Sequence, residues 1–362
     1  MTLEDFLSEW NNDSDRVLVH TSGSTGKPKP MMVEKKRMLN SARITCDFLG
    51  LKPGDSALLC MSLDYIAGKM VVVRSIERHL HLISVSPSGH PLKDINLKDA
   101  NGKYVNGEIT FAAMVPMQVY NTLQVPEERE RLSHVRHLII GGGAIDASLE
   151  KELQALPGNI AIWSTYGMTE TLSHIALRRI NGAEASEWYQ PFDSVKISQT
   201  EEGCLVIDAA LVCAETLVTN DIVEIEPYIY NKVEKHDKEE KHDKVEKLRF
   251  RIKGRKDNVI CSGGIKIQIE EVEALLKLHL EKPFMIAKKK DEKFGEIAVL
   301  LTEDEDLKKV EATIRRLLSG KSDDSNKSSE SKSHKYWIPR EYLHVDHLPL
   351  TETGKPKRCC LA

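Results

Sequence analysis

The sequence predicts an α/β protein: a large N-terminal domain of mixed β-sheets with helices, followed by a small C-terminal α+β domain. The first half alternates apolar, β-branched runs with amphipathic stretches, and the middle changes to short strands. After Gly254 the pattern becomes that of a small separate domain. The 362 residues suit about two domains. We place the boundary near Lys256, which gives a large domain at 1–256 and a small mobile domain at 257–362.

The alternating elements of the first half predict β-α units around a mixed or parallel sheet. Strands are expected at 16–20, 56–61, 137–140 and 160–163, and helices at 35–49 and 68–78. The last two strands run into Gly141-Gly142-Gly143 and Ser164-Thr165-Tyr166-Gly167. Ligands commonly bind α/β sheets at such strand ends, so these loops are candidates for a binding site.

The second half contains shorter elements. Strands are predicted at 194–197, 204–207, 222–225, 248–252, 284–287 and 297–301, and helices at 268–280 and 306–318. Two polar, charged stretches at 232–247 and 319–335 have almost no apolar residues and are interpreted as a solvated hairpin tip or disordered insertions. We assign them no function.

Composition narrows the class of partner. Lys and Arg total 51 against 55 Asp and Glu, and a net charge of -4 provides no broad basic surface for nucleic acid or anionic membrane. The seven cysteines show no C-x-x-C spacing, and no apolar run approaches the roughly 18 residues of a membrane span. We therefore expect a cytoplasmic protein whose partners are small soluble molecules; the oligomeric state cannot be read from the sequence.

A loop at 21–29 is the strongest local signal. It places two glycines, four hydroxyls and two lysines in nine positions after a predicted strand. Backbone N–H groups and hydroxyls of such a loop can surround phosphate oxygens while Lys27 supplies charge. The spacing of Gly23 and Gly26 excludes a Walker A motif. Taken alone, the loop could equally be a Gly/Ser-rich turn.

Three further segments carry suitable chemistry. The segment Tyr166-Gly167-Met168-Thr169-Glu170 offers an aromatic ring, a hydroxyl and a carboxylate, which suit a nucleobase, a phosphate and magnesium. It could also be an ordinary start of a helix. The segments 251–266 and 349–358 are rich in lysine, arginine and glycine, and each could be a basic turn.

Together and in this order, the four segments resemble the adenylate-forming superfamily of acyl- and aryl-CoA synthetases, peptide-synthetase adenylation domains and firefly luciferase. The resemblance runs from about Val17 to Arg358. It implies a small-molecule carboxylic acid as substrate, ATP, Mg²⁺ and coenzyme A as cofactor and co-substrates, and an acyl-AMP intermediate. Many members carry a long segment before the phosphate loop, whereas here the loop begins at Thr21, so the resemblance implies a truncated N-terminal subdomain.

The resemblance also implies residue roles. Residues assigned to ATP phosphates are Thr21, Ser22, Ser24, Thr25 and Lys27. Gly142 and Gly143 would lie beside adenine and the acyl group, Tyr166 would stack on adenine, Thr169 would contact the α-phosphate, and Glu170 would hold magnesium.

Further roles fall in the C-terminal part of the chain. Asp221 and Arg255 would contact the ribose, although Asn220 stands where the family has glycine, and Asp257 would be the hinge. Lys355 would catalyse adenylation, because an ammonium group stabilises charge that gathers on phosphoryl oxygens. Residues expected beside the incoming thiol are Ser262, Gly263 and Gly264.

The nature of the acid is less constrained. Segments 138–144 and 165–173 are most similar to the o-succinylbenzoate-CoA ligases of menaquinone biosynthesis. Tyr65 replaces the usual histidine of the acyl pocket, and Lys69 and Arg74 follow on the predicted helix. A second substrate carboxylate needs a cation nearby, for which we select Lys69.

Ser173 and His174 are expected behind Lys69 in this acyl pocket. An exposed or structurally paired Lys69 is an equal alternative. The alternative functions are ligation of another aryl or medium-chain acid, transfer to a carrier-protein thiol, and a non-catalytic nucleotide-binding protein.

Overall fold

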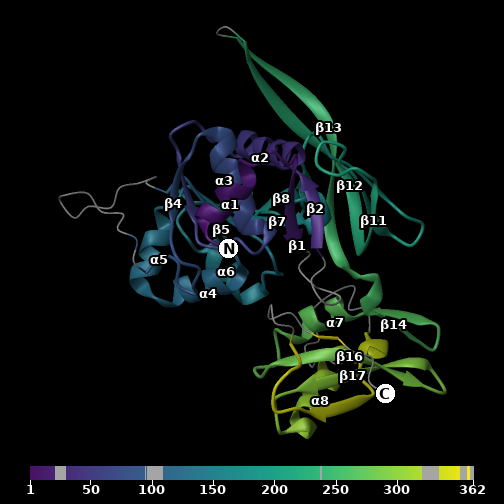
Figure 1. The fold of residues 1–362 in the computed structure, drawn as a ribbon. Coiled ribbons are helices and arrows are strands. Elements are labelled where there is room, and N and C mark those ends of the chain that lie inside the picture. The colour runs from purple at the N-terminus through teal and green to yellow at the C-terminus, as the bar shows by residue number, and fades with distance from the viewer. Residues whose placement is uncertain are drawn as a thin grey trace. The chain divides into compact units, whose positions relative to one another are not determined.

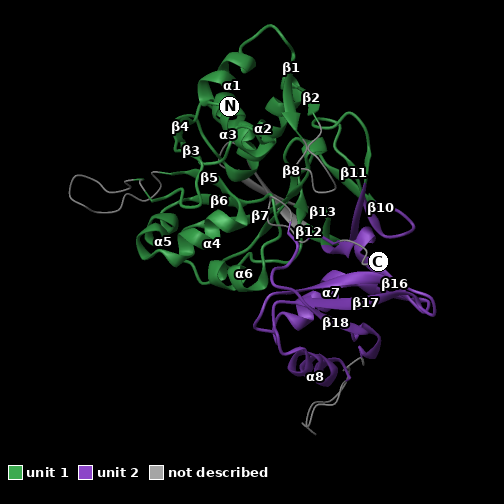
Figure 2. Ribbon diagram, turned by 60° about the horizontal axis from the view of Figure 1, so that its bottom comes forward, with its two compact units in different colours: residues 1–198, 206–218, 225–251 green, residues 199–205, 219–224, 252–362 purple. Residues whose placement is uncertain are grey.

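The structure of the chain is a computed structural model (Figure 1). It describes residues 1–20, 30–93, 95, 109–236, 239–319, 334–350 and 357–358, without the side chains of 230–244. The chain divides into two compact units (Figure 2). Unit 1 comprises 1–198, 206–218 and 225–251, and unit 2 comprises 199–205, 219–224 and 252–362. Segments of the two units therefore alternate along the sequence. The single domain boundary at Lys256 stays a prediction.

Unit 1 is built on a seven-stranded sheet with the order β4-β3-β5-β6-β7-β8-β9. Its strands are β3 (Ser56–Leu59), β4 (His81–Ser84), β5 (Phe111–Met114), β6 (His137–Ile140), β7 (Ala161–Gly167), β8 (His174–Arg179) and β9 (Gln190–Pro191). The first five strands in this order are parallel, and β8 pairs antiparallel with both β7 and β9. Every residue of β3 and β5 is buried, as expected for parallel strands covered on both faces. The predicted α/β class is confirmed.

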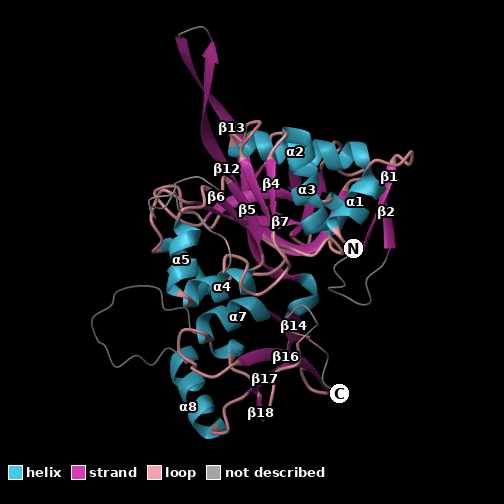
Figure 3. Ribbon diagram, turned by 60° about the vertical axis from the view of Figure 1, so that its left-hand side comes forward, coloured by secondary structure: helices cyan, strands magenta, loops and turns pink. Residues whose placement is uncertain are grey.

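Helices cover both faces of this sheet. They are α2 (Lys35–Leu49), α3 (Ile66–Arg78), α4 (Pro116–Gln124), α5 (Pro126–Ser133) and α6 (Ala147–Gln154). Helix α1 (Leu3–Trp10) contacts β1 (Arg16–His20) and α3. One core cluster joins Ala112 and Leu138 of the sheet to residues of α4, α5 and α6. On the other face Phe111 lies under Arg74 of α3, and α2 and α3 lie side by side (Figure 1 and Figure 3).

The first 255 residues contain two further sheets. Strands β1 (Arg16–His20) and β2 (Pro30–Glu34) form an antiparallel pair. Strands β10 (Lys196–Gln199), β11 (Cys204–Asp208), β12 (Leu217–His236) and β13 (Glu239–Arg255) form a four-stranded sheet in that order. The backbone of the charged stretch 232–247 thus continues β12 and β13 as strand except at 237–238, which lie outside the described residues.

Unit 2 contains a five-stranded sheet with two helices. The strands are β14 (Val259–Ser262), β15 (Ile265–Gln268), β16 (Phe284–Asp291), β17 (Gly295–Thr302) and β18 (Glu341–His344), and the helices are α7 (Ile269–Leu276) and α8 (Leu307–Leu318). Apolar residues of both helices pack on the sheet in one core that includes Val272, Ile314 and Leu300. The predicted helix at 268–280 ends at Leu276, earlier than expected.

Candidate nucleotide and acid site

The two glycine-containing loops predicted as ligand sites follow neighbouring parallel strands. Ile140 at the end of β6 is in register with Ser164 of β7, so Gly142 and Gly143 lie at the edge of the sheet beside the segment Tyr166–Thr169. Gly142 has a φ of +79°, which favours glycine. A Cβ on Gly141 would come within 2.5 Å of Thr165 Oγ1, so this close approach of the loops also requires glycine.

Strand β7 extends further than the sequence predicts. Residues 164–167 were expected to form a loop, but they continue the strand because β8 folds back antiparallel, pairing Thr165 with Leu177 and Tyr166 with Ala176. A Cβ on Gly167 would lie 2.3 Å from the Ser173 carbonyl oxygen, so only glycine permits this packing.

The side chain of Tyr166 is buried and held by aromatic neighbours. Its exposed fraction is 7%, and its ring centroid lies 5.1 Å from that of Phe250 and 6.0 Å from that of Tyr189, edge to face in both cases. Such packing fixes the ring orientation. The structure therefore supports a rigid Tyr166 at the end of β7, while its contact with adenine stays a prediction.

The next residues form the short 3₁₀ helix η1 (Thr169–Thr171). The Thr171 hydroxyl accepts a hydrogen bond from the Met168 N–H at 3.0 Å and donates to the Ser173 carbonyl at 2.7 Å, which closes the turn. Thr169 is buried and Glu170 is exposed. This turn presents the Glu170 carboxylate to solvent at the sheet edge and leads directly into Ser173 and His174.

Ser173 and His174 belong to a largely buried polar group that we call the Arg74 cluster: Thr45, Arg74, Ser173 and His174. Arg74 Nη2 donates to Ser173 Oγ at 2.6 Å and to Thr45 Oγ1 at 3.4 Å. Ser173 Oγ lies 3.2 Å from His174 Nδ1, and Thr45 Oγ1 lies 3.0 Å from His174 Nε2. Helices α2 and α3 thus meet the beginning of β8 through polar contacts.

The hydrogen bonds of the Arg74 cluster fit one consistent assignment of donors and acceptors. Thr45 Oγ1 donates to the Ser41 carbonyl at 3.1 Å, so it accepts from His174 Nε2–H. Nδ1 of His174 then accepts from the Ser173 hydroxyl, which itself accepts from Arg74. This arrangement requires a neutral imidazole. Burial, with the positive charge of Arg74 nearby, lowers the pKa of His174 well below 6.5, which agrees with a neutral imidazole.

Arg74 is a buried cation without a carboxylate partner among the described residues. Its exposed fraction is 2%, and its Nε has no hydrogen-bond partner. Burial lowers its pKa to about 10, so the guanidinium is still charged at neutral pH. A buried charge with an unmet donor is costly unless an anion joins it. The cluster is therefore suited to an anionic group such as a carboxylate.

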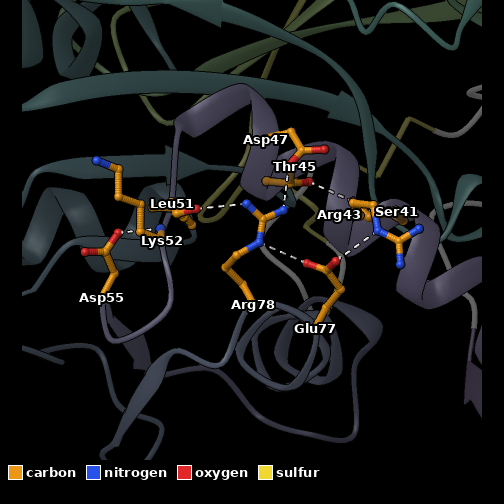
Figure 4. A network of polar contacts seen from close by, with 9 residues as sticks. All are labelled: Ser41, Arg43, Thr45, Asp47, Leu51, Lys52, Asp55, Glu77 and Arg78. Carbon is orange, nitrogen blue, oxygen red and sulfur yellow. Dashed lines mark hydrogen bonds and ion pairs between the residues drawn. The ribbon is translucent and has the colours of Figure 1, made fainter.

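A network of charged residues holds α2 against α3 (Figure 4). Arg78 of α3 donates to Asp47 of α2 and to the Leu51 carbonyl, the latter at 2.9 Å. Glu77 of α3 accepts from Arg43 of α2 at 3.0 Å. Because Thr45 lies on α2 and Arg74 on α3, this network fixes the two helices that meet at the cluster.

Lys69, our predicted partner for a second substrate carboxylate, does not join Ser173 and His174. Its Nζ donates to the Leu18 carbonyl at 2.6 Å and lies 3.7 Å from Glu9 Oε2. Five helical residues rotate the side-chain direction by roughly 140°, so Lys69 and Arg74 leave α3 on different sides. The alternative of a structurally paired lysine is the one observed, and Arg74 is the cation beside Ser173 and His174.

Tyr65 is likewise separate from this cluster. It precedes α3 as its N-cap residue and its exposed fraction is 53%, so it faces solvent. The acyl pocket predicted from Tyr65, Lys69, Ser173 and His174 is therefore not assembled as one group in the structure. Only Ser173 and His174 lie together.

In unit 2 the predicted ribose and hinge residues lie together. Arg255 Nη1 is 3.5 Å from Asp221 Oδ1, and Arg255 Nη2 donates to Asp257 Oδ2 at 3.0 Å. Asn220 Nδ2 donates to the same Asp257 oxygen at 3.3 Å. The structure thus brings Asp221, Arg255 and Asp257 into one network on β12, β13 and η2 (Lys256–Asn258).

Some of the remaining predicted residues lie in a described turn, and the others lie outside the described residues. Ser262 ends β14, and Gly263 and Gly264 form the turn to β15 with φ values of +57° and +82°. Residues outside the described part of the chain are Thr21, Ser22, Ser24, Thr25, Lys27 and Lys355.

Comparison with known protein families shows to which family the chain belongs. Residues 6–208, more than half of the chain, match the family described as "AMP-binding enzyme". The chain belongs to the AMP-binding enzyme family. A solved structure of an acyl-CoA synthetase (AMP-forming)/AMP-acid ligase II-like protein from Dyadobacter fermentans is 31% identical, with a TM-score of 0.59 over 98% of this chain and 90% of that one.

Other relatives of this AMP-binding chain are more distant. The 2-succinylbenzoate-CoA ligase of Haemophilus influenzae is 27% identical over 78% of this chain and 58% of its own length, and that of Geobacillus sp. (strain WCH70) is 27% identical over 48% and 33%. Both ligases are thus matched over less than two thirds of their length. O-succinylbenzoate coenzyme A synthetase from Bacillus subtilis, solved with ATP and magnesium, has a TM-score of 0.64 at 20% identity over 94% and 68%.

A magnesium ion would fit Glu170 of this AMP-binding chain. Mg²⁺ is commonly held by one or two carboxylates together with substrate phosphates and waters, and Glu170 is a single exposed carboxylate at the sheet edge. No group of three or more His, Cys, Asp or Glu residues in the described ranges could hold a metal by itself. Within the same ranges, no helix is both long and apolar enough to cross a membrane.

Proposed function

We propose that this protein is an ATP-dependent carboxylate-CoA ligase that forms an acyl-AMP and then a thioester, with an acid that carries a second carboxylate as its substrate. The candidate acid is o-succinylbenzoate, which would make the protein a cytoplasmic enzyme of menaquinone biosynthesis. The observation that carries the choice of acid is Arg74, because this buried cation lacks a carboxylate partner in the described residues.

Arg74 distinguishes a dicarboxylic acid from an apolar acid. The reacting carboxylate of either acid would be directed to the phosphates, so only an acid with a second carboxylate has a charge left for Arg74. The hydroxyls of Ser173 and Thr45 already hold the guanidinium at 2.6 and 3.4 Å, which orients the arginine in advance. The names of the relatives from Haemophilus influenzae and Geobacillus support the same acid.

In the first half-reaction, a carboxylate oxygen of the acid attacks the α-phosphorus of ATP, and the bond to pyrophosphate breaks. Lys27 and the hydroxyls of 21–25 would bind the β- and γ-phosphates, and Thr169 the α-phosphate. Magnesium held at Glu170 would supply positive charge to the phosphates. Lys355 would stabilise charge on the phosphoryl oxygens of the transition state.

In the second half-reaction, the thiolate of coenzyme A attacks the acyl carbon and AMP leaves. The turn Ser262-Gly263-Gly264 would line the path of the thiol, and Asp257 would be the hinge between the two arrangements of the small domain at 257–362. Asp221 and Arg255 would hold the ribose in both steps. Their ion pair at 3.5 Å supports a shared function.

The proposal is tested by acid-dependent exchange of labelled pyrophosphate into ATP. The acids compared are o-succinylbenzoate, benzoate and a medium-chain fatty acid, beside a reaction without acid. We expect exchange with o-succinylbenzoate well above the others. Exchange only with a monocarboxylic acid would agree with the proposed adenylation reaction but contradict the proposed acid substrate. No exchange with any acid, although ATP binds, would favour a non-catalytic nucleotide-binding protein.

A further inference from the structure

The backbone of Leu18 in β1 is bonded by two charged side chains on the edge that β2 does not occupy. Its N–H donates to Glu9 Oε1 of α1 at 2.9 Å, and its carbonyl accepts from Lys69 Nζ of α3 at 2.6 Å. In an antiparallel pair, alternate residues direct their backbone groups away from the partner strand. Glu9 and Lys69 thus satisfy the groups that a third strand would otherwise bind.

The two side chains also form an ion pair. Glu9 Oε2 lies 3.7 Å from Lys69 Nζ, and the exposed fractions of the two side chains are 23% and 3%. The ammonium group lies 5.5 Å from the ring centroid of Phe6, which is completely buried. Removing a hydrogen-bonded ammonium from water is costly unless its contacts are well formed, so this arrangement fixes one position of β1 against α1 and α3.

The position of β1 matters because the strand ends at His20, next to the predicted phosphate loop. Leu18 lies three residues before Thr21, and β2 resumes at Pro30 with the register His20 to Pro30. Displacing β1 along its axis would displace the point at which the chain enters residues 21–29. A displacement of about 1 Å at such a point can cost roughly a hundredfold in rate.

We propose that Glu9 and Lys69 are positioning residues that hold β1 at Leu18 and thereby set the affinity for the β- and γ-phosphates of ATP. The inference rests on the proposed function, in which residues 21–27 bind these phosphates. It assigns Lys69 to the strand that leads into the phosphate loop instead of to the acid.

The test compares the binding of magnesium-ATP and of AMP, without acid, by titration calorimetry. AMP lacks the β- and γ-phosphates, so it does not depend on the phosphate loop. The variants are Glu9→Gln, which keeps an oxygen for the Leu18 N–H, and the double variant Glu9→Gln/Lys69→Met, which leaves no unpaired buried charge. The control is Arg16→Gln, because Arg16 lies on the same strand in an exposed ion pair with Glu34 at 3.8 Å.

The double variant is expected to bind ATP about tenfold more weakly, the effect of losing a charged hydrogen bond, and AMP as before. Glu9→Gln should show a smaller change in the same direction, and Arg16→Gln none. Equal losses for ATP and AMP, or unchanged ATP affinity, would overturn the inference. If the unaltered protein binds ATP no more tightly than AMP, the proposed phosphate loop itself fails, and this inference fails with it.

Discussion

Replacing Arg74 by methionine should lower the activity of the protein without lowering its stability. Methionine fills much of the arginine volume without its charge, and it leaves the Ser173 hydroxyl free to donate to His174 as before. No carboxylate in the described residues is paired with Arg74, so the substitution leaves no opposite charge unpaired. Arg74→Met therefore differs from the usual disruption of a buried ion pair.

The expected magnitudes follow from the surroundings of Arg74. A fall of its pKa from 12.5 to about 10 corresponds to roughly 3 kcal/mol of unfavourable burial at neutral pH, where the group is charged in both folded and unfolded states. The hydrogen bonds to Ser173 and Thr45 offset part of this cost. The free energy of unfolding of Arg74→Met should thus be unchanged or higher, by up to about 3 kcal/mol.

The effect on activity should have the opposite sign. Loss of a charged hydrogen-bonding partner for the second carboxylate should cost about 3 kcal/mol, or about a hundredfold in kcat/KM for o-succinylbenzoate. Urea denaturation and pyrophosphate exchange measure the two quantities, and Arg129→Met, the same substitution at an exposed arginine of α5, is the matched control. A variant that is destabilised by more than about 2 kcal/mol, or that keeps full activity, would refute the role of Arg74.

Three further predictions concern other parts of the site. Lys355→Ala should abolish acyl-AMP formation yet retain thioester formation from supplied acyl-AMP; equal loss of both in rapid-quench assays would contradict two separate half-reactions. Burial depresses the pKa of His174 well below 6.5 and that of His137 to about 4. As the pH falls, these two histidines are therefore protonated in the unfolded chain before they are protonated in the folded protein. Stability should be full above about pH 6.5 and decline below it, and urea denaturation showing greater stability at pH 5 than at pH 7.5 would count against this. Gly167→Ala should destabilise the protein by about 2 kcal/mol or more, because its Cβ would overlap the Ser173 carbonyl, and an unchanged thermal midpoint would exclude that packing.

Much of the fold could be predicted because its elements carry clear periodic patterns. The helix expected at 35–49 has the bounds of α2, and the strand expected at 137–140 has those of β6. Strand β7 was predicted too short, since its last residues depend on pairing with β8, a contact that local sequence does not encode. Helix α1 was not predicted, although Thr2 and Asp5 form a capping box that could have revealed it.

The candidate site was predicted less completely. Ser173 and His174 were expected together and are together, because they are adjacent in the chain. Choosing between Lys69 and Arg74 required knowing which side of α3 faces β8 and which faces α1 and β1. That depends on packing between helices far apart in sequence. Thr45 was missed for the same reason, since only the packing of α2 against α3 brings it to Arg74.

The most direct test of the proposed function is AMP release from magnesium-ATP with o-succinylbenzoate, measured with and without coenzyme A. We predict sustained AMP release only when acid and coenzyme A are both present, and a strong reduction by Arg74→Met. AMP release independent of the acid, or turnover with o-succinylbenzoate that Arg74→Met leaves unchanged, would contradict the proposed function.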